Sequence, residues 1–562
     1  MIIYLLLGFF IIFVFLVPLF TARKRKQKLI DQLCWQWGKP NRDTYRNEFL
    51  IEQFSNLQQT PERLTDQTIA DIDMKDVFAF LDRTQTCVGQ QYFYYRLLHP
   101  SNNIASLEEL DRQIDFFSAN AVLREDIQII LSPLQKHDAH YISSLLKDNL
   151  FVKPKWHWLL TLDSVLVIAM LVLSIKFHVL LVWLMAPFTV NVLLHLWNKN
   201  NASQFVRSFP QLNRLIKISG ILSAKDIPFN KANATKSSKD LSRFQKRFRM
   251  LHFNSGTLDD VSSIMLWGFE LIKALLLIEV HSFLICIDEL QKKREAIVGL
   301  FSYIGGIDMA ISIASVRAGT PAYCKPTFPS PQKEMAVENV YHPLIENCTA
   351  NSLHIDGKSI LITGSNMSGK TTFIRTMAIN TVLAQTIYTC FAEKFVLPPL
   401  QILSSIRIKD DVLEGKSFYL AEVEAIHELI KASESAGQHM FVLDEVFKGT
   451  NTVERIAAAK AILSYLNRNG HLVLVSTHDL ELADLLQDEY DLYHFEEQVV
   501  NNELFFDHLI KKGKLTKRNA IQLLEIAGYP ESILVDARNI AGKSLLPDLR
   551  NKIPVGPLEQ KN

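Results

Sequence analysis

The sequence predicts two kinds of structure in one chain: an all-α core with transmembrane helices, followed by an α/β domain with a mostly parallel sheet. Three observations predict this. Long apolar runs lie within the first 200 residues, apolar residues recur at helical spacing over 29–150 and 200–315, and short apolar β-like runs alternate with helical segments after residue 333. Strands that alternate with helices are typical of a parallel sheet.

The composition limits the class of protein. At roughly 150 residues per domain, 562 residues correspond to about three or four domains. Lys and Arg number 60 and Asp and Glu 59, so the net charge of +1 gives no sign of a strongly basic nucleic-acid binder. The six cysteines form no C-x-x-C pair, which indicates neither a disulfide scaffold nor a zinc site and fits a reducing compartment.

The first apolar run, residues 2–20, carries no charge. As a helix it is about 28 Å long, close to the ~30 Å hydrocarbon core of a bilayer. Basic residues follow the run at 23–28 instead of preceding it, which favours an uncleaved anchor over a signal peptide. We therefore predict a transmembrane anchor at 1–21, with the rest of the chain on the cytoplasmic side.

A second apolar block, residues 156–197, is too long for one span and holds Lys176 and His178 in its middle. Two helices joined by a tight turn at 174–178 fit best, so we predict a transmembrane hairpin and a multi-pass protein. Asp163 counts against the first arm unless it lies off-centre or faces the protein. The competing interpretation is a buried helical hairpin in a soluble core.

Helical spacing and breaker residues set the other boundaries. A third apolar stretch, Met265 to Ile287, is interrupted by charges at helical spacing, so we predict a long amphipathic helix there and no span. Four prolines within 321–331 cannot continue a helix and predict an extended linker. The predicted parts are a helical core in two pieces, 22–155 and 198–320, the linker 321–333, the α/β domain 334–540 and a C-terminal tail 541–562.

A phosphate-binding motif opens the α/β domain. Residues 364–371 satisfy G-x-x-x-x-G-K-[S/T], between an apolar strand at Ser359–Thr363 and an apolar helix at Phe373–Gln385. The glycines let successive N–H groups face phosphate oxygens, and the helix N-terminus adds a positive dipole. Lys370 is expected to reach the β- and γ-phosphates and Thr371 to ligate Mg²⁺. The predicted ATP contacts are Gly364, Ser365, Asn366, Met367, Ser368, Gly369, Lys370, Thr371 and Thr372.

Two further strands end in side chains of matching chemistry. The strand Met440–Leu443 is followed by Asp444 and Glu445. The first carboxylate can hold Mg²⁺ through water and the second can polarise the attacking water. A third strand, 471–477, precedes His478, which is expected at the same sheet edge. The predicted catalytic residues are Glu445, His478 and Lys370, and the predicted metal ligands are Thr371 and Asp444.

Together these residues resemble the MutS family of DNA mismatch repair ATPases. The resemblance covers residues 340–490 in order and spacing, through His342–Ile345, Ile362–Thr372, Ser417–Glu424, Leu443–Asn451 and Ser476–His478. Weaker similarity covers Leu81–Thr86 and Leu97–Pro100 upstream, and Gly513–Ala537 downstream.

The resemblance implies an ATPase of the ABC-like type that dimerises around its nucleotide, with Ser417 acting in trans on the partner's γ-phosphate. Asn366 matches the family's P-loop asparagine. The chain departs from the family pattern at Ser365 and Ser368, which replace a proline and a glycine, and at Asp479. It also departs at Val446–Lys448. None of these departures removes a catalytic group.

Two regions bear on DNA. Only about 50 residues separate the anchor from the core-like segment, too few for the family's mismatch-reading and connector domains, and they contain no Phe-x-Glu. A basic stretch, 236–249, carries six Lys or Arg residues against Asp240, with Phe244 and Phe248 interleaved. It fits DNA phosphates, anionic lipid or a solvated helix face, and these alternatives stay open.

We therefore expect a membrane-tethered, ATP-dependent DNA-binding protein of the MutS type, in which ATP binding and hydrolysis close and open a homodimer on duplex DNA. Its cofactors would be ATP and Mg²⁺. The alternative is a nucleotide-switched membrane scaffold, or a partner-remodelling ATPase, that does not bind DNA. An ABC transporter ATPase fits less well because the chain has no L-S-G-G-Q.

Overall fold

The computed structural model divides the chain into two compact units. It describes residues 23–542 apart from 25, 42–46, 59, 61, 147–156, 202, 252–270, 273, 330–332, 366, 408–417, 436, 501–502 and 516–519. The predicted anchor at 1–21 therefore lies outside the described residues, and so do Asn366 and Ser417. The helical unit comprises residues 1–60, 81–96 and 109–319, and the α/β unit comprises 61–80, 97–108 and 320–562.

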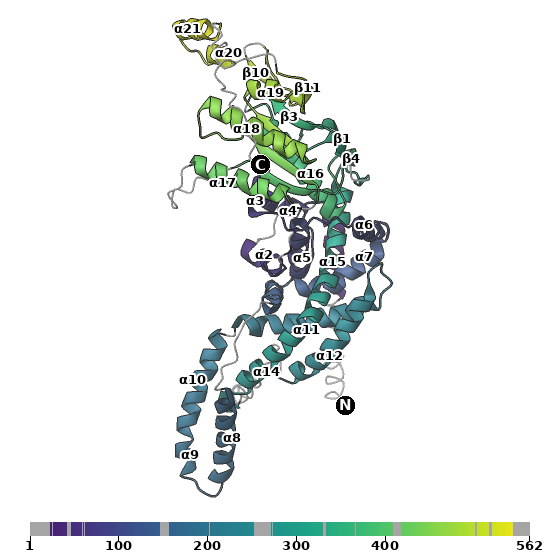
Figure 1. Ribbon diagram of the computed structural model, residues 1–562. Coiled ribbons are helices and arrows are strands. Elements are labelled where there is room, and N and C mark those ends of the chain that lie inside the picture. The colour runs from purple at the N-terminus through teal and green to yellow at the C-terminus, as the bar shows by residue number, and fades with distance from the viewer. Residues whose placement is uncertain are drawn as a thin grey trace, which may run out of the picture. The chain divides into compact units, whose positions relative to one another are not determined.

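The helical unit is built around α15 (Arg294–Gly319), which packs against α11 and α12 (Figure 1). Aromatic residues fill the surrounding core, where the ring of Phe54 stacks on Phe301 at 4.3 Å. Glycine is required at Gly305, because a Cβ there would lie 2.4 Å from the Cβ of Tyr92. The other helices are α2 (Glu48–Leu57), α5 (Cys87–Leu98), α6 (Ile104–Ala119), α7 (Ala121–Leu131), η1 (Ser132–Gln135), η2 (His137–Leu146), α11 (Ser203–Ser223) and α12 (Lys231–Leu251).

The predicted helical hairpin is present. It consists of α8 (His157–Ser174), α9 (Leu180–Trp183) and α10 (Met185–Asn201), with the turn where the sequence placed it. Two helices in the described part of the chain are long and apolar enough to cross a membrane, α8 and α15. They differ in burial, because α8 is mostly exposed whereas α15 is mostly buried in its unit. By length and composition alone, two such helices are weak support for a span.

Asp163 on α8 points toward protein. Its carboxylate accepts a hydrogen bond of 2.7 Å from the side chain of Asn191 on α10, which also donates to the carbonyl of Leu275 at 2.8 Å. The neighbouring Ser164 hydroxyl lies 3.0 Å from Nε2 of His281. The aspartate that the sequence left in question is therefore hydrogen-bonded inside the helical unit.

The helix predicted from Met265 to Ile287 is not continuous, and that prediction was wrong. Residues 265–270 lie outside the described part of the chain. The backbone of Leu277 is left-handed, with φ of 50°, and α14 (Ile278–Lys292) begins only after it. Helical spacing of charges and apolar residues does not reveal such a backbone break.

The α/β unit contains the mostly parallel sheet that the sequence predicts. Its six strands lie in the order β11-β8-β3-β7-β6-β5, with only β11 antiparallel to its neighbour. The predicted strands are all present. The strands are β3 (Ser359–Thr363), β5 (Gln401–Ser405), β6 (His439–Asp444), β7 (Leu472–Thr477), β8 (Tyr490–His494) and β11 (Lys511–Lys512).

Helices and smaller sheets complete this unit. The helix predicted at Phe373–Gln385 forms the centre of α16 (Lys370–Ile387). The described part of the stretch predicted as a linker contains no helix, and the backbone of its Cys324 pairs with that of Cys390 in an isolated antiparallel β-bridge. The other elements are α3 (Asp66–Asp71), α4 (Met74–Leu81), β1 (Glu334–Val340), β2 (Asn351–Asp356), β4 (Lys394–Val396), α17 (Phe418–Ser433), α18 (Thr452–Arg468), α19 (Leu480–Leu486), β9 (Glu497–Val500), β10 (Glu503–Phe506), α20 (Ala520–Ile526) and α21 (Glu531–Gly542).

A short segment from the first hundred residues belongs to the α/β unit, which the predicted boundaries did not anticipate. Asp71, at the end of α3, is fully buried against the C-terminal end of β5. Its carboxylate accepts hydrogen bonds from the Ser404 hydroxyl at 2.7 Å and from the backbone N–H groups of Ile406 and Arg407 at 3.0 and 2.9 Å. Asp71 thereby accepts the hydrogen bonds of backbone N–H groups that directly follow β5, the strand at the edge of the sheet.

Candidate nucleotide-binding site

Three neighbouring strands end at the same edge of the sheet. The register pairs Thr363 of β3 with Thr477 of β7, and Asp444 of β6 with Ser476 of β7. Residues that directly follow these strands therefore lie close together, as expected for the carboxyl ends of parallel strands. This edge carries the predicted phosphate loop, both predicted carboxylates and the predicted histidine.

The loop after β3 has the backbone of a phosphate cradle. Gly364 and Gly369 have φ of 148° and 110°, a region that favours glycine. A Cβ on Gly364 would lie 2.7 Å from the carbonyl oxygen of Phe495, so no side chain fits there. Gly369 is the N-cap residue of α16 and provides no side-chain cap, which leaves the first N–H groups of this helix available to an anion.

Lys370 is almost fully buried at this loop. Its ammonium donates hydrogen bonds of 2.7 Å to the carbonyls of Gly364 and Ser365. Burial lowers the pKa of the Lys370 amine to about 8, because desolvation disfavours the charged form. A phosphate beside the amine would favour its charged form, so the burial fits an anion site.

The two serines that depart from the family pattern, Ser365 and Ser368, form hydrogen bonds that hold the phosphate loop. The Ser368 hydroxyl donates to the carbonyl of Ser365 at 2.7 Å, and the Ser365 hydroxyl bonds to the carboxylate of Glu497. These bonds replace the conformational restriction that a proline would provide. Met367 at the tip of the loop is 74% exposed.

The two predicted metal ligands are in direct contact. The Thr371 hydroxyl donates to one oxygen of Asp444 at 2.9 Å, and the Ser476 hydroxyl bonds to the other. A hydroxyl and one carboxylate are oxygen ligands of the kind that Mg²⁺ takes together with water and substrate phosphates. No cluster of three or more His, Cys, Asp or Glu side chains suited to a metal occurs among the described residues.

Glu445 and His478, both predicted as catalytic, are in direct side-chain contact. Oε1 of Glu445 lies 2.6 Å from Nε2 of His478, and the Lys448 ammonium lies 3.4 Å from the other carboxylate oxygen. The hydrogen bond from His478 is the main cause that lowers the pKa of Glu445 to about 2. The backbone of Glu445 is left-handed, with φ of 54°, which turns its side chain away from the strand direction.

A cavity of about 390 Å³ adjoins the loop and lies within the size range of small-molecule sites. It mixes apolar side chains with backbone and side-chain polar groups. His508 closes part of it, with Nδ1 3.1 Å from the carbonyl oxygen of Ser368. Its lining includes Val340, Ile345, Asn347, Cys348, Asn351, Met367, Thr371, Thr372, Phe373, Phe495 and His508.

Two contributions to the site were not found from the sequence. The buried carboxylate of Glu422 on α17 accepts the N–H groups of Lys448 and Gly449 at 2.9 and 3.0 Å, which fixes the loop after Glu445. The sequence does carry a signal for Glu422. It stands four residues before Ile426, so this carboxylate lies on the apolar, buried face of α17.

The second contribution is a pair of side chains. Asp479, noted as a departure from the family, accepts two hydrogen bonds from Arg455 of α18, at 2.7 and 3.1 Å. This pairing anchors the segment directly after His478.

The predicted basic stretch lies in the helical unit, on α12. Lys236 and Lys239 are exposed there, whereas the side chains of residues 242–251 lie outside the described part of the structure. The stretch is thus helical, and the choice between DNA, lipid and solvent remains as the sequence left it.

Comparison with known proteins identifies the α/β unit. Residues 360–544 match the family model of MutS domain V. The chain is 31% identical over 265 residues to the DNA mismatch repair protein MutS of Lactobacillus acidophilus, an alignment that covers 45% of this chain and 31% of the relative. It is 28% identical over 324 residues to the protein of that name from Thermotoga maritima, covering 56% and 40%. The matched part thus spans about a third of the first relatives' length.

Proposed function

We propose that this member of the MutS family is a membrane-tethered ATPase that binds ATP and Mg²⁺, closes as a homodimer on duplex DNA and reopens after hydrolysis. One observation carries the ATPase proposal. The Thr371–Asp444 pair and the Glu445–His478 pair lie at adjacent strand ends beside a phosphate cradle that contains a buried lysine.

The chain's own residues would divide the work of ATP hydrolysis. The open N–H groups at the start of α16 and the Lys370 ammonium would bind the β- and γ-phosphates. Thr371 and Asp444 would hold Mg²⁺, which neutralises charge that develops on phosphate oxygens. The Lys370 ammonium now donates hydrogen bonds to two backbone carbonyls, and on binding it would donate to phosphate oxygens instead, so its position favours binding.

Glu445 is suited to positioning water. With a pKa near 2 its carboxylate is charged at neutral pH, so it can accept a hydrogen bond from the attacking water and orient it toward the γ-phosphate. His478 would hold that carboxylate in place and contact the γ-phosphate from the next strand. Glu422 would keep the loop that carries Glu445 in one conformation.

Dimerisation would complete the site. Ser417, which would act on the partner's γ-phosphate, directly precedes α17 in the chain. Apolar side chains of α17 and α18 are exposed, among them Tyr419, Leu420 and Val453. Exposed apolar side chains are suited to a partner surface.

Membrane attachment is supported by the surface of the hairpin. Leu162, Val165 and Ile168 of α8, with Val182 and Trp183 of α9, are all about half or more exposed. Apolar side chains in this number are unfavourable in water and favourable in lipid. Because Asp163 is hydrogen-bonded to Asn191, its charge is not presented to lipid.

DNA binding rests on the family and on the basic stretch of α12. The second candidate function, a nucleotide-switched membrane scaffold that does not touch DNA, is favoured by the hairpin, which gives ATP-driven closure a membrane element to move. The two candidates make opposite predictions about DNA.

The test uses the full chain reconstituted in lipid nanodiscs. Phosphate release and duplex binding are measured between 50 and 300 mM salt, with and without ATP, beside Lys370→Ala. We expect Mg²⁺-dependent hydrolysis that the variant loses, and duplex binding that weakens steeply with salt. Full hydrolysis by the variant would refute the site. Hydrolysis without DNA stimulation or salt-dependent binding would refute the DNA function and leave the scaffold.

A further inference from the structure

A second cavity of about 390 Å³ lies within the helical unit, separate from the nucleotide site. Four segments far apart in the sequence line it. These are residues 33–41 at the end of a helix, Arg83 and Gln85 before α5, Gln128 of α7, and Ile311 with Ser315 of α15. Its volume is within the range of sites for small organic molecules.

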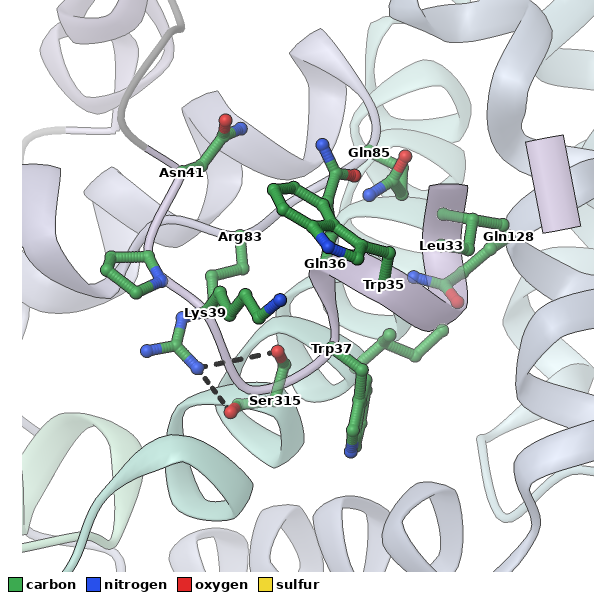
Figure 2. Close-up of a pocket in the computed structure, with 12 residues that line it drawn as sticks. Leu33, Trp35, Gln36, Trp37, Lys39, Asn41, Arg83, Gln85, Gln128 and Ser315 are labelled. Atoms are coloured by element: carbon green, nitrogen blue, oxygen red, sulfur yellow. Dashed lines mark hydrogen bonds between the residues drawn. The ribbon is translucent and has the colours of Figure 1, made fainter. Parts of the chain in front are cut away.

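Arg83 forms the buried wall of this cavity and is more than nine-tenths buried. One terminal nitrogen of its guanidinium bonds to the carbonyl and hydroxyl of Ser315, as Figure 2 shows. Its Nε is buried with no hydrogen-bond partner in the described structure. No described carboxylate forms an ion pair with Arg83. Burial lowers the pKa of Arg83 to about 10, and the group still remains charged at neutral pH.

The remaining lining is positive or neutral. Among the described lining residues, Lys39 is the other charged one and none is acidic. Amide side chains supply further donors, from Gln36, Gln85 and Gln128. A buried guanidinium with an unmet donor, surrounded by amides and a lysine, favours an anion, because anions accept hydrogen bonds from all of these groups.

Aromatic side chains supply a flat apolar surface. Trp35 lines the cavity and is 68% exposed, an unusual position for a large apolar ring. The Lys39 ammonium lies 4.0 Å from the centroid of this ring. Figure 2 shows Trp35, Lys39 and Arg83 around one space, and Trp37 also lines this cavity. The Trp37 ring is covered by the guanidinium of Arg124 at 3.5 Å, so Trp35 is the ring left for a ligand.

We propose that this cavity binds a small planar organic anion, an aromatic ring that carries a carboxylate or phosphate group. The anionic group binds Arg83 and Lys39, and the ring packs on Trp35. Carboxylate and phosphate oxygens both suit a guanidinium, so the ligand's source is decided by experiment. This site is independent of the proposed ATPase function.

Binding is measured by calorimetry on the full chain in nanodiscs, with saturating ADP and Mg²⁺ present so that the nucleotide site is occupied. The probes are indole-3-acetate, its neutral amide indole-3-acetamide, a nucleoside 5′-monophosphate and inorganic phosphate. We expect saturable binding of at least one ring-bearing anion, at least tenfold tighter than indole-3-acetamide and inorganic phosphate. The tighter of the two anions identifies carboxylate or phosphate as the natural group.

Three variants locate the binding. Arg83→Gln should abolish it, and Lys39→Glu and Trp35→Ala should each weaken it about tenfold or more. Lys136→Glu, which makes the same charge change at an exposed lysine of this unit outside the cavity, should not alter it. If Arg83→Gln does not fold, the variants at the exposed residues Lys39 and Trp35 still test the proposal.

Specific outcomes would overturn the proposal. These are no saturable binding of either ring-bearing anion at 5 mM, equal binding of indole-3-acetate and its amide, equal binding of inorganic phosphate and the monophosphate, or full affinity in both Lys39→Glu and Trp35→Ala.

Discussion

The two units each bury a cation without an ion-pair partner among the described residues, and in each unit backbone carbonyls accept its hydrogen bonds. In the α/β unit Lys370 donates to the carbonyls of Gly364 and Ser365. In the helical unit Arg83 donates to the carbonyl of Ser315. Backbone carbonyls are weak substitutes for a counter-ion, so both positions are suited to a ligand anion.

A third buried cation shows the opposite solution. Arg317, near the end of α15, is as buried as Lys370 and Arg83, but its guanidinium lies 2.7 Å from the carboxylate of Asp111 and 3.2 Å from that of Asp115. Its charge is neutralised within the fold. We therefore expect Lys370 and Arg83 to serve binding and Arg317 to serve stability, and one substitution tests each expectation.

The largest effect is expected at Lys370. Lys370→Ala removes the positive charge at the β- and γ-phosphates, so hydrolysis should fall by about 10²–10³-fold, or about 3–4 kcal/mol in the barrier. Because the lysine has no ion-pair partner in the described structure, the free energy of unfolding should change far less than at Arg317. Phosphate release and urea denaturation of the same preparation measure the two quantities.

The matched control is Lys358→Ala, an exposed lysine on the turn before β3. It should leave hydrolysis unchanged. Equal loss of activity in both variants would show that the effect comes from general charge on the unit and not from the phosphate cradle.

The next largest effect is expected at Arg317. Arg317→Gln leaves the largely buried Asp111 without its cation, and removal of one member of a buried pair costs about 3 kcal/mol or more. Protection of α15 amides, followed by hydrogen exchange and mass spectrometry, should fall accordingly. ATP hydrolysis per folded molecule should remain, because Arg317 lies outside the nucleotide site.

Arg112→Gln provides the comparison on α6, where Arg112 pairs with Glu109 at the surface. Exposed pairs contribute about 0–1 kcal/mol, so exchange in α15 should be unchanged. If the α15 amides exchanged equally in Arg317→Gln and Arg112→Gln, the buried ion pair of Arg317 would stabilise the fold no more than an exposed pair. Arg317 could then no longer be contrasted with Arg83 as a residue that serves stability.

A smaller effect is expected at Glu422, which acts through the loop it holds. Glu422→Ala removes the acceptor of the Lys448 and Gly449 N–H groups, so Glu445 would be positioned less well. Loss of such a supporting contact typically costs 10–100-fold in activity. We expect kcat to fall within about this range with little change in KM, in steady-state kinetics.

Glu424→Ala on the exposed side of the same helix is the control. If Glu422→Ala raised KM and left kcat unchanged, Glu422 would act on nucleotide binding and not on the position of Glu445.

The sequence was sufficient to predict those features of the site that depend on contiguous residues or on the topology of the sheet. Lys370 was predicted from its motif, and the position of His478 at the same sheet edge followed from the rule that parallel strands end together. It was insufficient where contacts join distant segments. The cavity around Arg83 combines residues separated by more than 200 positions, and nothing local marks Asp71 as the residue that holds the end of β5. Asp163 needed a structure to show that it faces Asn191.

The smallest effect expected is a pH dependence that belongs to Lys370. Burial gives its amine a pKa of about 8, below the ordinary 10.5. Above pH 8 the ATP-free protein increasingly holds a neutral amine, whereas phosphate binding needs the ammonium, so ATP binding takes up a proton. The Kd for ATP should therefore rise with pH above 8, by at most about tenfold per pH unit.

The lowered pKa of Lys370 also affects stability. As pH rises it weakens ATP binding but increases the stability of the fold. Between pH 8 and 10.5 the unfolded chain binds more protons at this lysine than the folded chain, so the lysine's contribution to the free energy of unfolding increases with pH. Lys370→Met cannot titrate and isolates the effect by difference in both calorimetry and urea denaturation. If wild type and Lys370→Met showed the same pH dependence in both measurements, Lys370 would be fully charged in the ATP-free protein. The cradle would then already neutralise its charge, as Asp111 and Asp115 do for Arg317.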